Sequence, residues 1–170
     1  MRIGYVSSQI PGETDALLSG LANRLKSDGR NLAGIVKDTT FDSRFENGCD
    51  MKVRVLPAGP SVKITQDLGD GSGACRLDPG AIATSVARVE ASALDQADLF
   101  ILNKFGPEEA AGRGFCDVIG TALELGVPVL VGVGQGLIPE FETFAAGLAT
   151  RVAAEEAALF EWCASSDIEA

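Results

Sequence analysis

The chain has 170 residues, of which 46% are hydrophobic and 22% are charged, enough for one globular domain with its own core. Fourteen Lys and Arg residues stand against 24 Asp and Glu, a formal net charge of −10, and the sequence has no basic, aromatic-rich stripe. This balance argues against nucleic acid and anionic membrane surfaces as partners. A small polar ligand fits better.

Histidine is absent from the sequence. Its absence removes the commonest general base, the Ser-His and Cys-His nucleophile pairs and most zinc chemistry. Catalysis would therefore need carboxylates, Lys, Cys or a metal held by oxygen. The four cysteines, Cys49, Cys75, Cys116 and Cys163, are widely separated and lack a Cys-x-x-Cys motif. We expect free thiols in a reduced, cytoplasmic protein, and we regard a thiolate metal site as the weaker alternative.

The N-terminal part of the chain alternates apolar runs with a helical pattern. Residues 2–8 predict a buried strand, residues 15–27 a helix that Thr14 or Asp15 caps, and residues 32–36 a second strand. This order is the right-handed unit that builds a parallel sheet. No secretory signal is recognisable here, and no apolar run of the chain approaches the roughly 20 residues that span a bilayer.

Residues 39–73 interrupt that pattern. Two alternating segments, 51–56 and 61–65, predict an antiparallel hairpin that turns at residues 57–60, and a glycine-rich loop follows at 67–73. The alternation of helices and strands then resumes. The later elements predicted from apolar periodicity are a helix that begins at Asp78-Pro79, a strand at 98–102, a helix at 107–125 interrupted by Gly112-Arg113-Gly114, a strand at 127–133, and helices at 139–151 and 153–162.

These elements predict an α/β fold for residues 1–170 as a single domain. We expect three layers, with a mainly parallel, P-loop-NTPase-like sheet of about five strands between helices and a β-hairpin insertion at 39–73. Polar residues follow the strand at 98–102, where Asn103 and Lys104 come directly after the apolar run. Ligands of open α/β sheets bind at the carboxyl ends of the strands, so these two residues mark the expected site.

The loop after the first strand has the spacing of the Walker A motif, G-x-x-x-x-G-K-[ST], over residues 7–14. Gly12 and Thr14 match the motif, whereas Ser7 replaces its first glycine and Glu13 replaces its lysine. Because that lysine contacts the β- and γ-phosphates, a carboxylate in its place should repel them. Considered alone, the loop is more often an ordinary turn than a phosphate site.

Residues 75–133, with the successive segments CRLDPGAIATSV, ADLFILNKFG, EEAAGRGF and GVPVLVGV, resemble the second half of the small P-loop nucleoside-triphosphatases of the thermostable archaeal and bacterial type. In those enzymes the middle strand ends in an acidic pair, a hydrophobic residue and a glycine, with a glutamate shortly after. Asn103 and Lys104 stand at the acidic pair here, and Glu109 is the match for the glutamate and a candidate catalytic residue. The NKFG and GRGF segments with CRLDPGA also resemble an uncharacterised bacterial family often found beside molybdate-transport genes.

The resemblance implies that both motifs have lost their charged catalytic positions, so we expect binding rather than Mg²⁺-dependent hydrolysis. The candidate anion- or nucleotide-binding residues combine small residues and amides of two loops with three cations expected at the carboxyl edge. They are Gly12, Thr14, Ser72, Arg76, Asn103, Lys104 and Arg113.

Structural alternatives stay open for each cation. Lys104 is equally compatible with a solvated residue past a strand end, Arg113 with a helix pair to Glu109 or Asp117, and Arg76 with a pair to Asp78. Glu109 fits a first helical turn without any catalytic role.

We therefore expect a P-loop-like protein that binds a nucleotide or a small oxyanion without hydrolysis. The resemblance implies a link to molybdate metabolism, and the expected ligands are a nucleotide with Mg²⁺, or molybdate or tungstate. One alternative is a divergent nucleoside-triphosphatase in which Glu109, Glu13 or Asp15 recruits Mg²⁺. Another is a protein-interaction module with an empty inherited pocket, and self-association into a homo-oligomer is compatible with each.

Overall fold

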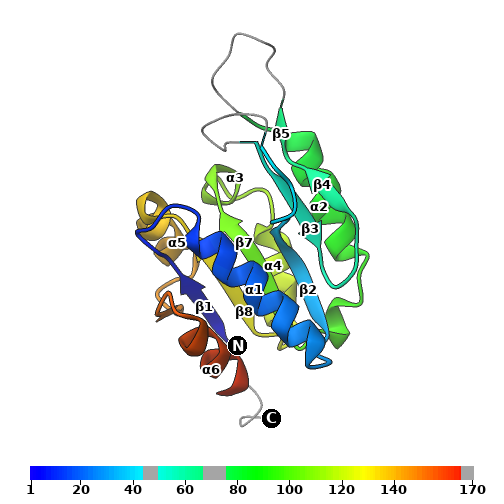
Figure 1. Ribbon diagram of the computed structural model, residues 1–170. Helices are drawn as coiled ribbons and strands as arrows, with labels where there is room; N and C mark the ends of the chain where they lie inside the picture. Colours follow the sequence, from blue (N-terminus) through cyan, green and yellow to red (C-terminus); the bar gives the residue numbers. More distant parts are fainter. Residues whose placement is uncertain (44–49, 67–75, 166–170) are drawn as a thin grey trace.

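A computed structural model describes residues 1–43, 50–66 and 76–165. Within these ranges, seven strands form one sheet in the order β4-β3-β2-β7-β8-β1-β9 (Figure 1). They are β1 (Ile3–Val6), β2 (Leu32–Lys37), β3 (Lys52–Val55), β4 (Ser61–Lys63), β7 (Leu99–Phe105), β8 (Val129–Val133) and β9 (Thr150–Val152). The pairs from β2 through β7, β8 and β1 to β9 are parallel, whereas β3 and β4 are antiparallel. A separate antiparallel ribbon joins β5 (Thr65–Gln66) to β6 (Arg76–Leu77).

Helices cover both faces of the sheet, so the predicted three-layer α/β architecture is confirmed (Figure 1). The helices are α1 (Glu13–Ser27), α2 (Pro79–Glu90), α3 (Pro107–Ala110), α4 (Cys116–Glu124), α5 (Ile138–Phe144) and α6 (Glu156–Ala164), with 3-10 turns at Leu94–Gln96 and Gln135–Leu137. Apolar residues of α1 and α6 form one core, and those of α2, α4 and α5 form another. None of the helices in the described ranges has both the length and the apolar character needed to cross a membrane.

The central strand β7 contributes to both cores. Leu99 and Ile101 pack on the side of α1, whereas Phe100 and Leu102 pack on the side of α2 and α4. A strand buried on both faces explains the continuous apolar run in the sequence. The register between β7 and β8 shifts between Leu102 and Phe105, so the strand becomes irregular at the end where its polar residues lie.

The predicted hairpin is confirmed, since β3 and β4 pair across residues 57–60. It also extends the main sheet, because β3 pairs with β2. The glycine-rich loop at 67–73 lies outside the described residues. The predicted break in the helix at 107–125 is confirmed as well: Gly112 and Gly114 have positive φ values of 78° and 59° and separate α3 from α4.

Two local predictions were wrong. The helix predicted at 139–151 ends at Phe144, and the short edge strand β9 follows it. Ala146 and Gly147 have φ values of 50° and 71°, a left-handed conformation that stops a helix. Helix α1 begins at Glu13 with Gly12 as its N-cap and no side-chain cap, rather than with a Thr14 or Asp15 cap. The predicted Asp78 cap is confirmed, since its carboxylate accepts from the N–H groups of Gly80 and Ala81.

Gly34 in β2 tests the packing of the central strands. Its φ is 102°, and a Cβ there would lie 2.0 Å from the carbonyl oxygen of Ile101. We expect Gly34→Ala to lower the free energy of unfolding by at least about 2 kcal/mol, because both the backbone conformation and the strand spacing oppose a side chain. Urea denaturation measures the change. Gly20→Ala is the control, because a Cβ on that α1 residue meets nothing within 4 Å, and it should be neutral or stabilising.

Candidate functional site

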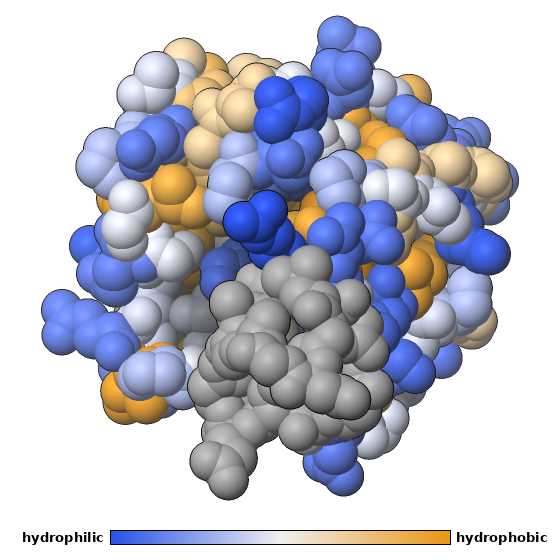
Figure 2. Space-filling model, turned by 90° about the horizontal axis from the view of Figure 1, so that it is seen from above, coloured by the Kyte–Doolittle hydropathy of each residue, from blue (hydrophilic) through white to orange (hydrophobic). Residues whose placement is uncertain are grey.

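A cavity of about 180 Å³ opens between the first turn of α1 and the ends of β7 and β8. We call it the edge cavity. Its lining comes from the loop before α1, from β7 and from the loop after β8, with Gly12, Thr14, Asn103, Lys104 and Gly134 among the residues. Figure 2 shows this end of the molecule, where strongly hydrophilic residues lie near the centre of the view. The sequence placed the site at the same edge.

The Walker-A-like loop is held by hydrogen bonds among its own residues. The backbone N–H of Ser8 donates to the Thr14 hydroxyl at 3.0 Å, and the N–H of Ile10 donates to the Ser8 hydroxyl at 3.0 Å. The Ser8 hydroxyl in turn donates to the carboxylate of Glu13. Glu13, at the position of the motif lysine, therefore binds its own loop and does not line the edge cavity.

Helix α1 nevertheless presents free donors to the edge cavity. The backbone N–H groups of Thr14 and Asp15, in its first turn, have no hydrogen-bond partner among the described residues. Both residues line the cavity. The first turn of a helix combines such free donors with the positive end of the helix dipole, which is an arrangement suited to an anion.

Asn103 lines the edge cavity but is committed to the fold. It is 1% exposed, its Oδ1 accepts from the backbone N–H of Lys37 at 2.8 Å, and its Nδ2 donates to Oδ1 of Asp15 at 3.1 Å. The other oxygen of Asp15 lies 3.7 Å from the ammonium of Lys37. One buried amide thus joins the ends of β7 and β2 to the first turn of α1. Both polar atoms of the side chain are therefore engaged in holding the fold.

Lys104 is the exposed cation in the lining of the edge cavity. It forms no ion pair with any described residue. Its ammonium is available to an anion that occupies the cavity. Lys37 is the second cation nearby, although Asp15 offsets its charge. The sequence did not identify Lys37. Its place directly at the end of the second parallel strand was the available signal.

The predicted convergence of three cations is not what the structure shows. Arg113 forms a bidentate ion pair with Glu108, with nitrogen–oxygen distances of 2.8 and 3.1 Å, and its side chain is 63% exposed. This hydrogen bonding holds the pKa of the Glu108 carboxyl below its usual value. Arg76 is exposed on β6 and does not line the edge cavity. Ser72 lies outside the described residues.

Glu109, the candidate catalytic residue, lies on the other side of β7 from the edge cavity. It is 6% exposed, and its carboxylate accepts from the N–H groups of Gly106 at 2.9 Å and Phe115 at 3.1 Å. A Cβ on Gly114 would lie 2.1 Å from Oε1 of Glu109, so the glycine lets the loop close over the carboxylate. This geometry favours a structural role for Glu109.

Metal ligands are sparse around these residues. No group of three or more His, Cys, Asp or Glu residues in the described ranges is placed to hold a metal ion. Burial, with the carboxylates of Glu109 and Asp117, raises the pKa of the Cys116 thiol to about 11. The thiol is therefore protonated at neutral pH, when a thiolate would be needed for metal binding.

The chain belongs to the family described as "Protein of unknown function (DUF2478)", whose sequence pattern matches residues 3–162. A curated relative, the molybdenum import ATP-binding protein ModC 2 of Bradyrhizobium diazoefficiens, is 30% identical over 163 residues. The match covers 95% of this chain but only 18% of that protein.

Two solved structures share the fold at low sequence identity. A human cancer-related nucleoside triphosphatase has a TM-score of 0.60 at 13% identity, over 89% of this chain and 87% of the other. THEP1 from Aquifex aeolicus has a TM-score of 0.59 at 14% identity, over 89% and 88%. These likenesses show that the chain has the fold of these nucleoside-triphosphatases, and they confirm the predicted fold class.

Asn103→Asp tests whether the buried amide is structural. We expect a loss of about 2–4 kcal/mol in the free energy of unfolding at pH 7, because the new carboxylate would be buried beside Asp15 and could not donate to it. The loss should shrink as the pH falls, because protonation of the new carboxyl at position 103 removes its buried charge. Urea denaturation across pH measures both effects. Lys104→Asp, an exposed change next to it, should alter stability little, and equal losses in the two variants would contradict the role of Asn103.

Glu109→Ala tests the buried carboxylate on the other side of β7. Because the N–H groups of Gly106 and Phe115 would lose their acceptors, we expect a loss of about 2–4 kcal/mol in the free energy of unfolding. Glu108→Ala is the matched control, since it removes only an exposed ion pair and should change the thermal midpoint little. A Glu109→Ala variant as stable as Glu108→Ala would contradict the structural role.

Proposed function

We propose that the protein binds an oxyanion group in the edge cavity without hydrolysing it. The group is either a phosphoryl group of a nucleotide or a free tetrahedral oxyanion such as molybdate or tungstate. The observation that carries this proposal is the lining of the cavity of about 180 Å³. It combines Lys104 with N–H donors of the first turn of α1, and none of these groups has an ion-pair or hydrogen-bond partner among the described residues.

The binding chemistry follows from these groups. The N–H groups of Thr14 and Asp15 donate to oxygens of the anion, and Lys104 supplies the compensating positive charge. Lys37 reduces the opposing effect of Asp15, because it lies 3.7 Å from that carboxylate. Gly132 lets β8 approach β7 at the cavity wall, since a Cβ there would lie 2.1 Å from the carbonyl oxygen of Asn103.

The residues present do not fit the Mg²⁺ ion that hydrolysis by this fold requires. The position of the metal-binding acid holds Asn103, whose oxygen already accepts from Lys37, and the next position holds a cation. Asp15 is bound to Asn103 and Lys37, and Glu13 is bound to Ser8. Without a metal and without an acid to position water, the phosphoryl group is held but not cleaved.

A link to molybdenum import is the finer part of the proposal, and the relative from B. diazoefficiens supports it. That protein is described as a molybdenum import ATP-binding protein, and it aligns with this chain over 163 residues at 30% identity. Because the match covers 18% of the relative, the shared part is one segment of a longer protein. A binding domain that senses the transported oxyanion, or the nucleotide used in its transport, fits both the match and the cavity.

The test is a thermal-shift screen of the purified protein against ATP, GTP, phosphate, sulfate, molybdate and tungstate, each with and without Mg²⁺. A ligand at 100 times its dissociation constant stabilises the protein by about 2.7 kcal/mol. We expect stabilisation by at least one of these anions that does not depend on Mg²⁺, with no phosphate released from ATP or GTP. Lys104→Ala should weaken the binding at least about tenfold, because it removes the unpaired cation.

Arg113→Ala is the matched control, because that cation is paired with Glu108 outside the edge cavity. Arg113→Ala should leave the affinity for the anion unchanged. An equal loss of affinity in both variants would instead support the predicted site with three cations. Release of phosphate that needs Mg²⁺ would favour the divergent nucleoside-triphosphatase. If none of the anions stabilised the protein, the binding proposal would be wrong, and an interaction module would be the better description.

A further inference from the structure

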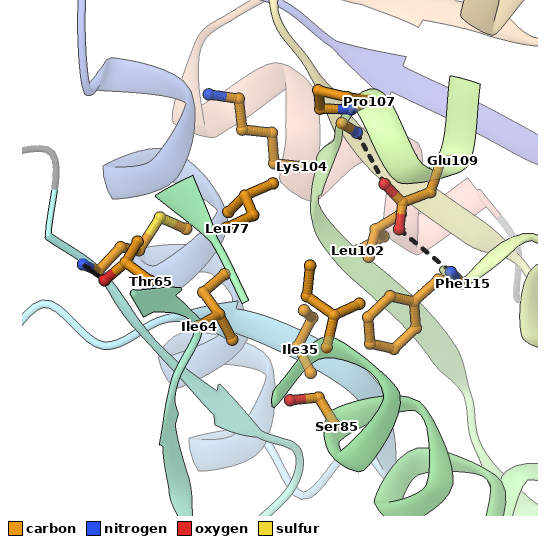
Figure 3. Close-up of a pocket in the computed structure, with 13 residues that line it drawn as sticks. Ile35, Ile64, Thr65, Leu77, Ser85, Leu102, Lys104, Pro107, Glu109 and Phe115 are labelled. Atoms are coloured by element: carbon orange, nitrogen blue, oxygen red, sulfur yellow. Dashed lines mark hydrogen bonds between the residues drawn. The ribbon is translucent and has the colours of Figure 1, made fainter. Parts of the chain in front are cut away.

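A second cavity, of about 220 Å³, lies on the opposite side of β7. We call it the apolar cavity. Its walls come from β2, the ribbon of β5 and β6, the end of β7 and the start of α4, and Figure 3 shows the side chains that converge on it. Most of these are apolar, as the principal lining residues show: Ile35, Ile64, Leu77, Leu102 and Phe115.

Apart from Lys104, the polar side chains that line the apolar cavity are already bonded within the protein. The Ser85 hydroxyl donates to the carbonyl oxygen of Ala81 at 3.0 Å, and the Thr65 hydroxyl donates to Asp50 at 2.8 Å. The Glu109 carboxylate accepts from two backbone N–H groups. The cavity therefore offers an apolar surface with few free donors, which suits an apolar or aromatic group better than a second anion.

The size of the apolar cavity suits a ring. A protein cavity of about 150 Å³ lined by aliphatic and aromatic residues is large enough for benzene. The larger volume here, together with Phe115 in the wall, accommodates an aromatic ring system. Leu77 also lines this cavity, and it is 37% exposed.

Lys104 belongs to both cavities. It is among the residues that line the edge cavity and among those that line the apolar cavity. In Figure 3 its ammonium points away from the apolar side chains, while its stem lies at their margin. It lies in the segment of β7 where the register with β8 shifts, between Leu102 and Phe105. An apolar stem with a charged head is suited to a ligand that is apolar at one end and anionic at the other.

We propose that the two cavities form one site for an organic phosphate ester, with the phosphoryl group in the edge cavity and the ring in the apolar cavity. Lys104 lies between the two halves of the ligand. This inference rests on the proposed function and narrows it, because a free oxyanion would leave the apolar cavity without a use.

The test compares probes that differ only in the group attached to phosphate. Isothermal titration measures methyl phosphate, 1-naphthyl phosphate and AMP against the wild-type chain. We expect 1-naphthyl phosphate to bind at least about tenfold more tightly than methyl phosphate, because its ring leaves water. Leu77→Ser should reduce this preference severalfold and leave methyl phosphate unchanged. Leu148→Ser, at a 60% exposed leucine that lines neither cavity, is the control and should change nothing.

The results separate this inference from the proposed function. Equal affinity for methyl and naphthyl phosphate, or a preference that Leu77→Ser leaves intact, would overturn the joint site while the anion site stands. Failure of all three probes would overturn the joint site, and the proposed function would fall with it only if phosphate, molybdate and tungstate also left the thermal midpoint unchanged. Lys104→Ala should weaken both esters, and naphthyl phosphate binding that ignores this change would place its phosphoryl group elsewhere. If Leu77→Ser weakens the binding of AMP, the apolar cavity accepts a nucleobase. If it does not, the cavity accepts a ring other than adenine. Thermal midpoints of the variants verify that each is folded.

Discussion

The buried amide of Asn103 is the constraint on which the edge of the sheet depends. It accepts from the backbone of Lys37 and donates to Asp15, so it fixes the ends of β7 and β2 against the first turn of α1. A carboxylate could not make both bonds, because it has no donor for Asp15. An amide at this position thus holds together the three elements that shape the edge cavity.

The neighbouring position has a complementary effect. Lys104 places a positive charge at the end of the central strand, and it forms no ion pair with the described residues. In the loop before α1, Glu13 stands at the lysine position of the Walker A motif. Its carboxylate accepts a hydrogen bond from the Ser8 hydroxyl. An anion bound as we propose would contact Lys104 on the side of the sheet and the N–H donors of the first turn of α1 on the other side.

Much of the fold could be predicted because its signals are local. The apolar run of β7, the periodic leucines of α1, the Asp78 cap and the two glycines around Arg113 each act within a few residues. Strand β9 could not be predicted in this way. It has three residues, and its pairing with β1 joins segments far apart in the chain.

The site was harder to predict for the same reason. The edge itself follows from the topology, and Gly12, Thr14, Asn103 and Lys104 do lie together there. Asn103 bonds to Lys37 and Asp15, which precede it in the chain by 66 and 88 positions. These bonds depend on how the strands assemble, and no local sequence pattern predicts them. Arg113 shows the reverse case: its pairing with Glu108, five positions earlier, depends on the glycine break between α3 and α4 and not on regular helix spacing.

The most direct test of the edge cavity is to map a bound anion onto individual backbone amides. Amide nitrogen–proton NMR spectra, recorded while phosphate and then molybdate are added, report on each N–H group separately. The expected result is that the largest shifts fall on the amides of Thr14 and Asp15, with smaller shifts near Lys104. Saturable shifts confined to other parts of the chain, or no saturable shift with either anion, would contradict an anion site at the first turn of α1.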